Sequence, residues 1–495
     1  MNQTTIFDMM YPKYKITKPI RLIELFGGYG SQALALKYLG VEFEHWKLVE
    51  WAIKSIQAYK DIHFENDNFD YSQPFDIDTL KKFLLNKGIS SNYNEPMTIQ
   101  QIDRLNEKQI RNIYNNIVST NNLVNIQQVK GKDLNIVRED IYEYILTYSF
   151  PCQDLSLAGK GKGMSDTSTR SGMLWEVERI LTECKELGTM PQVLLMENVP
   201  QVHSTDNMPD FHKWQVRLEE LGYKSYWQDL IATDYGIPQT RNRCFMVSIL
   251  GDYSYTFPKP IPLKLKLKNM LEDNVDEKYY LSDDLMKHIQ KTAEEHEEYT
   301  QYERYNGDLE MWCRVWKDKS PTLNTKCKDT KIYVKNATKK GYLEATDGDG
   351  IDISSRMEHH RGTVQKGKSQ TLTTMGGENN GVVVNMKKKL CNELVEQGKV
   401  KENDVIRHNY TTSKNGDCIQ SNNEAPTLDT RCDCLGVVNN LRIRKLTPRE
   451  CFRLMGVRDE DFDKCAKNQS DSSLYHLAGD SIVVNVLMAI FKELL

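Results

Sequence analysis

Arg21-Leu-Ile-Glu-Leu-Phe26 is a short apolar run that leads into the glycine cluster Gly27-Gly-Tyr-Gly30. The run predicts a buried strand, and the glycines predict a tight turn. Residues 31–39 then show helical apolar spacing, and Gly40 is placed to end the helix. A strand that enters a helix through a glycine turn is typical of the opening unit of a doubly wound α/β fold.

Further apolar runs predict the rest of this sheet. They occupy residues 46–51, 141–150, 193–196 and 244–249. Strands that alternate with helical stretches predict an α/β architecture with a parallel sheet. Near the end of the chain, Thr447 followed by Pro448 and Glu450 predicts a helix start with a capping box. The apolar residues 481–495 are expected to pack back on the first domain.

Two segments interrupt the α/β pattern. Residues 62–130, rich in Asn and Lys, carry apolar residues at helical spacing and predict a helical insertion. Residues 256–440 contain many Gly, Thr and β-branched residues and predict a β-rich second domain. We therefore expect one domain from residues 1–255 plus 441–495, and a second from residues 256–440.

The second domain contains an internal repeat. Three similar hexapeptides, each with a Thr-Leu pair, occur at residues 320–325, 369–374 and 425–430. Their Thr-Leu pairs begin at Thr322, Thr371 and Thr427. The favoured interpretation is three similar strands of one sheet, and the alternative is three serial recognition modules.

Composition sets the class of protein. The chain has 495 residues, of which 39% are hydrophobic and 27% charged, and its mean hydropathy is −0.59. These values indicate a soluble globular protein. No apolar run reaches the roughly 18 residues of a membrane-spanning helix, so we expect no membrane association. Residues 1–18 lack a secretion signal, which favours the cytoplasm.

Charge is unevenly distributed along the chain. Lys and Arg number 65 and Asp and Glu 69, so the net charge of −4 argues against a globally basic nucleic-acid binder. Residues 312–340, however, contain nine basic and two acidic side chains, a net of +7. Contact with a polyanion would therefore be local and sensitive to salt.

The eleven cysteines do not form metal-binding spacing. Their number is odd and no two lie three residues apart, which predicts free thiols and no metal site. Cys152 stands out because Phe150-Pro151-Cys152-Gln153 directly follows a predicted strand. A thiol there lies where α/β enzymes place reactive residues. The loop after it, residues 157–163, combines hinge glycines with lysines that could contact phosphates.

Three other motifs carry polar chemistry at strand ends. The glycine turn allows close approach of a ligand, and Glu50, 20 residues after Gly30, could bind ribose hydroxyls. Glu197 ends a buried run and could exchange a proton with a substrate ring. Arg241 and Arg243 alternate on one face of a strand, where they could bind phosphate or a base oxygen. The glycine turn by itself fits a nicotinamide or flavin enzyme equally well.

Taken in order, these motifs resemble those of the bacterial and phage DNA (cytosine-5) methyltransferases. The resemblance covers the chain apart from the helical insertion and the variable segment, and includes the closing Gly479-Asp480-Ser481-Ile482. It implies an α/β, doubly wound, Rossmann-like domain that uses S-adenosylmethionine, together with a β-rich target-recognition domain. The chain departs from the family pattern at Asp480, where Asn is more usual, and at Ser31, where Gly is frequent.

The resemblance also implies roles for individual residues. The catalytic group would be Cys152 as nucleophile, Glu197 as acid, and Arg241 and Arg243. The S-adenosylmethionine pocket would be lined by Phe26, Gly28, Gly30, Glu50, Trp51, Asp140, Ile141, Asp480 and Ile482. Contacts with DNA would come from Gln153, Ser156, Lys160, Lys162, Gln239, Thr322, Thr371 and Thr427.

The implied reaction is methyl transfer from S-adenosylmethionine to carbon 5 of cytosine in a specific DNA sequence, through a covalent Cys152 adduct on a flipped-out base. The implied setting is a monomer that binds double-stranded DNA in the cytoplasm of a prokaryotic or phage-infected cell. A separately acting restriction endonuclease is a further partner that the family allows. A tRNA cytosine-5 methyltransferase and a nicotinamide-dependent Rossmann oxidoreductase are the alternatives.

Overall fold

The computed structural model describes three long stretches, residues 11–151, 171–280 and 441–495. Between residues 280 and 441 it describes the segments 308–310, 328–338, 342–346, 348–352, 363–372, 380–385, 405–407 and 418–420. The chain divides into two compact units. The first comprises Met1–Leu265, Thr371–Gly376 and Cys451–Leu495, and the second comprises Lys266–Gln370 and Gly377–Glu450.

A six-stranded sheet forms the centre of the first unit, with strand order β2-β1-β3-β4-β6-β5. β1 pairs in parallel with β2 and β3, and β3 pairs in parallel with β4. The strands are β1 (Ile20–Leu25), β2 (Phe43–Val49), β3 (Glu143–Tyr148), β4 (Val193–Asn198), β5 (Tyr223–Ile231) and β6 (Asn242–Leu250). The predicted α/β sheet is therefore confirmed, with each predicted run on a strand.

The sheet differs from the prediction at one edge. β6 runs antiparallel to both of its neighbours, and β5 is a strand that the sequence analysis did not predict. β5 escapes detection because Lys224, Ser225 and Gln228 interrupt its apolar residues. The connection between β5 and β6 has no room for the crossover that a parallel pair requires, so the two strands form a hairpin.

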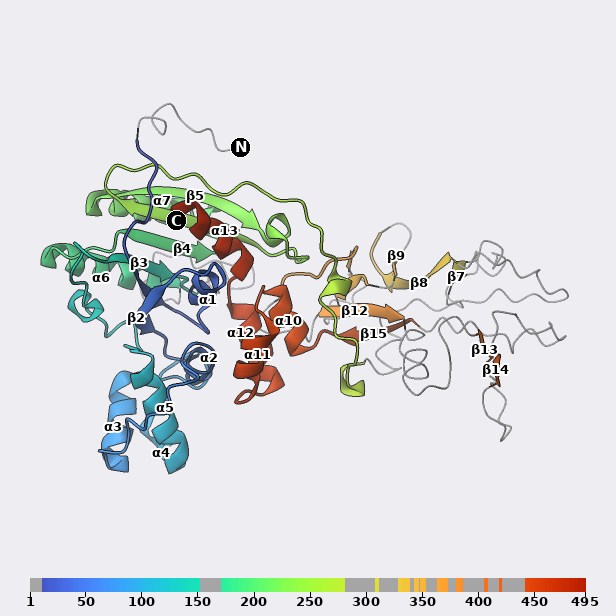
Figure 1. The fold of residues 1–495 in the computed structure, drawn as a ribbon, viewed down its shortest axis with the longest axis horizontal. Helices are drawn as coiled ribbons and strands as arrows, with labels where there is room; N and C mark the ends of the chain where they lie inside the picture. The colour runs from blue at the N-terminus through green and yellow to red at the C-terminus, as the bar shows by residue number, and fades with distance from the viewer. Residues whose placement is uncertain are drawn as a thin grey trace. The chain divides into compact units, whose positions relative to one another are not determined.

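Helices cover both faces of the sheet. Every residue of β1, β3 and β4 is buried, which is possible only if both faces are packed. α6 (Leu174–Leu187) and α7 (Met208–Leu221) share one core with the strands, and Trp214 of α7 donates a hydrogen bond to the hydroxyl of Tyr148 at 3.1 Å. α1 (Ser31–Tyr38) and α13 (Val484–Leu494) pack against each other, as Figure 1 shows.

The C-terminal stretch Asp471–Leu494 is, by length and composition, the one candidate membrane span in the described part of the chain. It forms two helices, α12 (Asp471–Asp480) and α13. Of its apolar window, 72% is buried inside the protein. Its hydrophobicity is therefore used in packing, as expected for residues 481–495.

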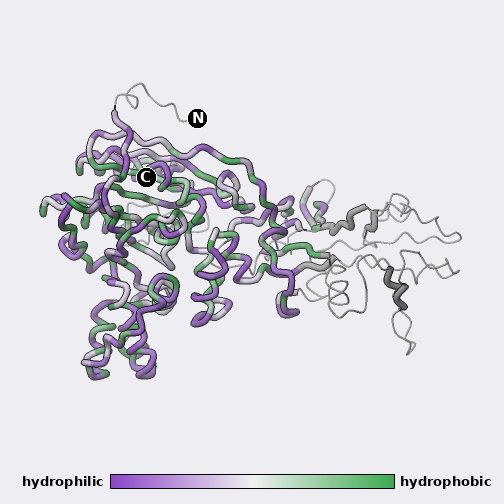
Figure 2. The backbone as a smooth tube through the Cα atoms, viewed as in Figure 1, coloured by the Kyte–Doolittle hydropathy of each residue, from purple (hydrophilic) through white to green (hydrophobic). Residues whose placement is uncertain are grey.

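The segment predicted to be helical contains α3 (Ile77–Lys87), α4 (Ile99–Asp103) and α5 (Glu107–Ser119), which lie apart from the sheet (Figure 1). Capping boxes begin α4 at Thr98 and α5 at Asn106. Their apolar sides form a separate core with Ile56 of α2 (Ile53–His63). Figure 2 shows hydrophilic and hydrophobic residues alternating along these helices, as amphipathic helices require.

Strands make up most of the described regular structure of the second unit. Its largest sheet has the order β11-β10-β12-β15, and shorter sheets contain β7-β8-β9 and β13-β14. Their bounds are β7 (Asp308–Glu310), β8 (Lys328–Lys335), β9 (Tyr342–Ala345), β10 (Gly350–Asp352), β11 (Val364–Gln365), β12 (Asn380–Asn385), β13 (Val405–Arg407), β14 (Cys418–Gln420) and β15 (Leu441–Lys445).

A buried carboxylate joins β15 to the start of α10 (Pro448–Leu454). Glu450 accepts two hydrogen bonds from the Arg444 guanidinium, at 2.7 and 2.6 Å, and one from the backbone NH of Thr447 at 2.8 Å. The Thr447 hydroxyl in turn accepts from the Glu450 NH at 3.2 Å, which confirms the predicted capping box. The backbone NH of Glu272 is a further donor, at 2.8 Å.

We expect Glu450→Ala to lower the free energy of unfolding by about 3–5 kcal/mol, because the buried Arg444 charge would lose its partner. Urea unfolding followed by tryptophan fluorescence measures the change. Glu460→Ala is the matched control, since its ion pair with Arg458 is long, at 3.8 Å, and exposed. It should change the free energy by less than about 0.5 kcal/mol. Equal effects of the two substitutions would contradict the assignment.

Candidate active site

The turn between β1 and α1 places three residues in the left-handed region of backbone conformation. Phe26, Gly28 and Gly30 have φ values of 57°, 56° and 82°. A Cβ atom at Gly30 would lie 2.4 Å from the Nε2 of His63 and 2.7 Å from the ring of Tyr59, so only glycine fits there. Gly30 is therefore required for packing against α2, whereas a Cβ atom at Gly28 would meet nothing within 4 Å, so the open side of the turn lies at Gly28.

Glu50 follows β2 directly and binds to this turn. Its Oε2 accepts a hydrogen bond from the NH of Gly28 at 3.0 Å, and its Oε1 accepts from the NH of Ala52 at 2.8 Å. Burial raises the pKa of Glu50 to about 7 against the opposing effect of these two hydrogen bonds, and the charge of Asp480 raises it further. A carboxylate that titrates near neutral pH thus lies beside the glycine turn.

The end of α12 joins the same place. The Ser481 hydroxyl donates a hydrogen bond to the hydroxyl of Tyr29, inside the glycine turn, at 2.8 Å. Asp480 forms an ion pair with His476 at 3.0 Å, and Ile482 is buried. The structure therefore brings together the predicted pocket residues of the first turn, of β2 and of the C-terminal motif.

Asp140 and Ile141 lie at the other edge of the sheet. They precede β3, whose first residue, Glu143, pairs with Ile20 at the amino end of β1. The glycine turn follows the carboxyl end of β1, and a six-residue strand separates the two edges by roughly 20 Å. Asp140 is instead paired with exposed Arg138 at 3.2 Å. The prediction that these residues line the pocket is wrong.

Asn122 is the neighbour of Glu50 that the sequence analysis missed. Its side chain accepts a hydrogen bond from the Glu50 NH at 3.1 Å and donates one to the Glu50 carbonyl at 2.9 Å. Asn122 also bridges in parallel to Leu48 of β2. The available signal was the apolar run 123–126 after α5, which marks the return of the chain to the sheet.

Trp51, another predicted pocket residue, packs against the core of α3, α4 and α5.

Glu197 lies near the carboxyl end of β4 and is 7% exposed. Its Oε1 forms an ion pair with the Nε of Arg243 on β6 at 3.1 Å. Burial raises the pKa of Glu197 more than the charges of Arg243 and Arg241 lower it. The carboxyl group is therefore easier to protonate than an exposed one, as a proton donor requires.

Arg241, two residues before Arg243, holds backbone carbonyl groups of other segments in place. It is 4% exposed, and its guanidinium donates hydrogen bonds to three backbone carbonyls. The acceptors are Leu372 at 3.0 Å, Gly479 at 3.1 Å and Ser481 at 2.7 Å. Arg241 thus connects the strand that carries Arg243 with the motif that contains Asp480.

Cys152 lies outside the described residues, as do Gln153, Ser156, Lys160, Lys162, Thr322 and Thr427. The chain that leads to Cys152 is described as far as Pro151. There the side chain of Asn198 donates a hydrogen bond to the carbonyl of Phe150 at 3.0 Å, one residue after Glu197. The described end of this segment is thus attached to the strand that holds Glu197.

Two of the predicted DNA contacts, Gln239 and Thr371, are among the described residues. Gln239 is fully buried, and its side-chain nitrogen donates to the carbonyl of Leu454 at 2.8 Å. A side chain in that position cannot reach DNA, so this prediction is wrong and Gln239 has a structural role. Thr371 is half-buried and belongs to the first compact unit.

Comparison with known proteins identifies the family. The chain matches the family model of the C-5 cytosine-specific DNA methylases over residues 87–495. It is 28% identical to the type II methyltransferase M2.ScrFI of Lactococcus lactis subsp. cremoris, over 96% of this chain and 99% of that protein. It is 35% identical to the orphan methyltransferase M.SssI of Spiroplasma monobiae, over 54% of this chain and 68% of that protein.

A solved structure, that of the S. pombe Dnmt2 methyltransferase, shares 14% identity and a TM-score of 0.47 with the chain, over 96% of this chain and 98% of that one. The nicotinamide-dependent oxidoreductase that the glycine turn alone allowed is not the class that the family model indicates. Because the match spans most of the chain and includes Glu197, Arg243 and Asp480, this protein belongs to the C-5 cytosine-specific DNA methylase family.

Proposed function

We propose that this DNA (cytosine-5-)methyltransferase acts through a covalent adduct between Cys152 and carbon 6 of a cytosine turned out of the duplex. The observation that carries the proposal is the buried Glu197–Arg243 pair at the end of β4, one residue from Asn198. Asn198 attaches the segment that leads to Cys152. A thiol and a protonatable carboxyl group are the two groups that activation of a cytosine ring requires.

We place S-adenosylmethionine at the glycine turn between β1 and α1, beside Glu50. Gly28, with open space where a Cβ atom would lie, permits close approach of the backbone, and the buried Glu50 carboxylate can accept hydrogen bonds from ribose hydroxyls. Phe26 belongs to the same turn. Asp480 and Ile482 flank Ser481, whose hydroxyl is hydrogen-bonded to Tyr29 of the turn. We propose that residues 122–126, next to Glu50, line the S-adenosylmethionine pocket in place of Asp140 and Ile141. When bound, S-adenosylmethionine supplies the methyl group.

The reaction then follows from the chemistry of the two groups. The Cys152 thiolate forms a bond to carbon 6 while Glu197 donates a proton to ring nitrogen 3, which makes carbon 5 nucleophilic. Carbon 5 would take the methyl group that S-adenosylmethionine supplies, and the remainder of that molecule would leave as a neutral thioether. Removal of the carbon 5 proton by a solvent base would then expel the Cys152 thiolate from carbon 6, and the proton on nitrogen 3 would return to Glu197. Arg243 holds the Glu197 carboxyl group in place during these transfers.

The second unit is our candidate for recognition of the DNA target. Its described strands form sheets, and Thr322 and Thr427 belong to it by sequence position. Residues 157–163 lie outside the described residues and are our candidate for the loop that closes over the flipped base. Flipping the base out of the duplex costs a few kcal/mol. We propose that the protein acts as a monomer in the cytoplasm of a prokaryotic or phage-infected cell. The similarity to the type II methyltransferase of Lactococcus lactis allows a separate restriction endonuclease as a further partner.

Cys152→Ser should abolish transfer of labelled methyl groups to DNA and the covalent adduct with DNA that contains 5-fluorocytosine. The hydroxyl group is a much weaker nucleophile than the thiolate at neutral pH. Cys184→Ala is the control, because Cys184 is a buried cysteine of α6. It should retain both activities. An adduct that persists in Cys152→Ser would refute the proposal, and preferential methylation of RNA would favour the tRNA alternative.

Glu197→Gln should lower the single-turnover rate of methyl transfer by roughly 10²- to 10⁴-fold, since the amide cannot transfer a proton. The affinity for DNA should change far less, because Gln keeps the shape of the side chain. Single-turnover kinetics and fluorescence anisotropy with labelled DNA separate the two quantities. A parallel loss of both would show that Glu197 acts in binding and not in chemistry.

The affinity for S-adenosylmethionine should fall as pH decreases from about 8 to about 6, with a limiting slope of about tenfold per pH unit below the pKa of Glu50. The pKa of about 7 means that the carboxylate is neutralised over this range. Equilibrium binding, not turnover, is the appropriate measurement because turnover also depends on proton transfer by Glu197. Asp480→Asn removes a nearby negative charge and should shift the profile to lower pH, whereas Glu50→Gln should bind weakly and without this pH dependence.

A further inference from the structure

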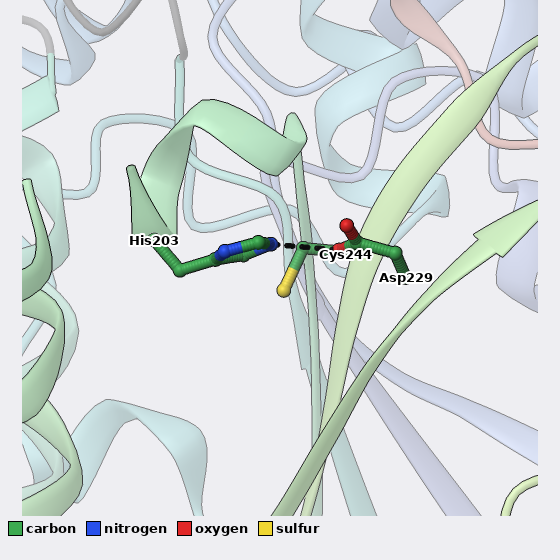
Figure 3. A group of neighbouring side chains, drawn as sticks. All are labelled: His203, Asp229 and Cys244. Carbon is green, nitrogen blue, oxygen red and sulfur yellow. Dashed lines mark hydrogen bonds and ion pairs between the residues drawn. The ribbon is translucent and has the colours of Figure 1, made fainter. Parts of the chain in front are cut away.

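Three side chains with metal-binding atoms meet at the antiparallel edge of the sheet. His203 ends the short 3-10 helix η5 (Pro200–His203), Asp229 lies on β5 and Cys244 on β6. His203 Nε2 is 2.9 Å from Asp229 Oδ1, and the donor atoms of all three residues lie within 4.8 Å of one another. Figure 3 shows the three side chains pointing toward one another.

Strand pairing fixes two of these donors. Asp229 and Cys244 are opposite each other in the register of β5 and β6, so their side chains emerge on the same face of the sheet. Arg243, the next residue along β6, points to the opposite face, where it pairs with Glu197. The cluster is therefore separate from the Glu197–Arg243 pair.

The donor set suits zinc. An imidazole nitrogen, a thiolate and a carboxylate oxygen are all ligands that Zn²⁺ accepts. Tetrahedral coordination with bonds of about 2.0–2.3 Å requires donor atoms roughly 3.3–3.6 Å apart. The His203–Asp229 distance of 2.9 Å is slightly shorter than this, and all three donor atoms lie within 4.8 Å of one another. Cys244 is completely buried, whereas His203 and Asp229 have side-chain exposures of 21% and 32%. An ion can therefore enter from the side of the latter two.

We propose that His203, Asp229 and Cys244 form a binding site for Zn²⁺, to which the described residues supply three ligands. Binding exchanges the proton of the Cys244 thiol for the metal, and that proton passes to solvent. The deprotonated thiol is the form of cysteine that binds a metal ion.

The site has a structural consequence. His203 follows β4 by a few residues, while the other two ligands belong to the β5–β6 hairpin. A bound ion joins the end of β4, and with it residues 197 and 198, to the edge of the sheet. The ligands are not spaced as a motif in the sequence, so a search for paired cysteines does not find them.

Binding of Co²⁺ to the full-length protein, stripped with chelator and kept reduced without added thiol, tests the site. We expect one ion per chain and a thiolate-to-cobalt absorption band, with competition by Zn²⁺. Cys244→Ala should lose the band, and the nearly isosteric Asp229→Asn and His203→Gln should weaken binding by at least about tenfold. Circular dichroism checks that each variant is folded.

Two controls make the outcome decisive. Cys184→Ala and His212→Gln alter a buried cysteine and an exposed histidine outside the cluster, and both should bind Co²⁺ like the unaltered protein. Added Zn²⁺ should raise the unfolding temperature of the unaltered protein but not that of Cys244→Ala. A missing band in the unaltered protein, or an unchanged band in Cys244→Ala, would overturn the proposal and leave a hydrogen-bonded His203–Asp229 pair beside a neutral thiol.

Discussion

The parallel pairing of β1 with β2 and β3, and of β3 with β4, is the constraint on which the site depends. Parallel strands end at the same edge of a sheet, so the turns that follow them lie side by side. Glu50 after β2, the glycine turn after β1, Pro151 after β3 and Glu197 on β4 are neighbours for this reason. The hydrogen bond from Gly28 to Glu50 is the most direct sign of this convergence.

The C-terminal segment completes the same edge through polar contacts. Ser481 bonds to Tyr29, and Arg241 holds the carbonyls of Gly479 and Ser481. These residues are more than 200 positions apart in the sequence. Buried guanidinium and hydroxyl groups require such partners, because an unpaired polar group in the interior is costly. Arg241 therefore connects Gly479 and Ser481 to the start of β6, whereas Arg243 positions the Glu197 carboxyl group.

The sequence predicted the strands with continuous apolar runs and missed the one without. β1, β3 and β4 are buried on both faces, which leaves an unmistakable apolar pattern. β5 has mostly half-buried residues and escaped notice. The family resemblance assigned Gln239 to DNA, yet its side chain donates a hydrogen bond to the carbonyl of Leu454 in the interior. Asp140 was misplaced because the insertion with α3, α4 and α5 obscures where the chain rejoins the sheet beside Asn122.

By itself, the sequence determined the α/β class, the glycine turn and the order of the chemical motifs, because these depend on local residue pattern. Only the tertiary structure decided which of the polar residues meet. Strand order and register bring His203, Asp229 and Cys244 together. They also set the carbonyl contacts of Arg241 and place Asp140 at the opposite edge of the sheet. Strand order and pairing bring together segments that are distant in the sequence, so the local pattern alone does not show which side chains become neighbours.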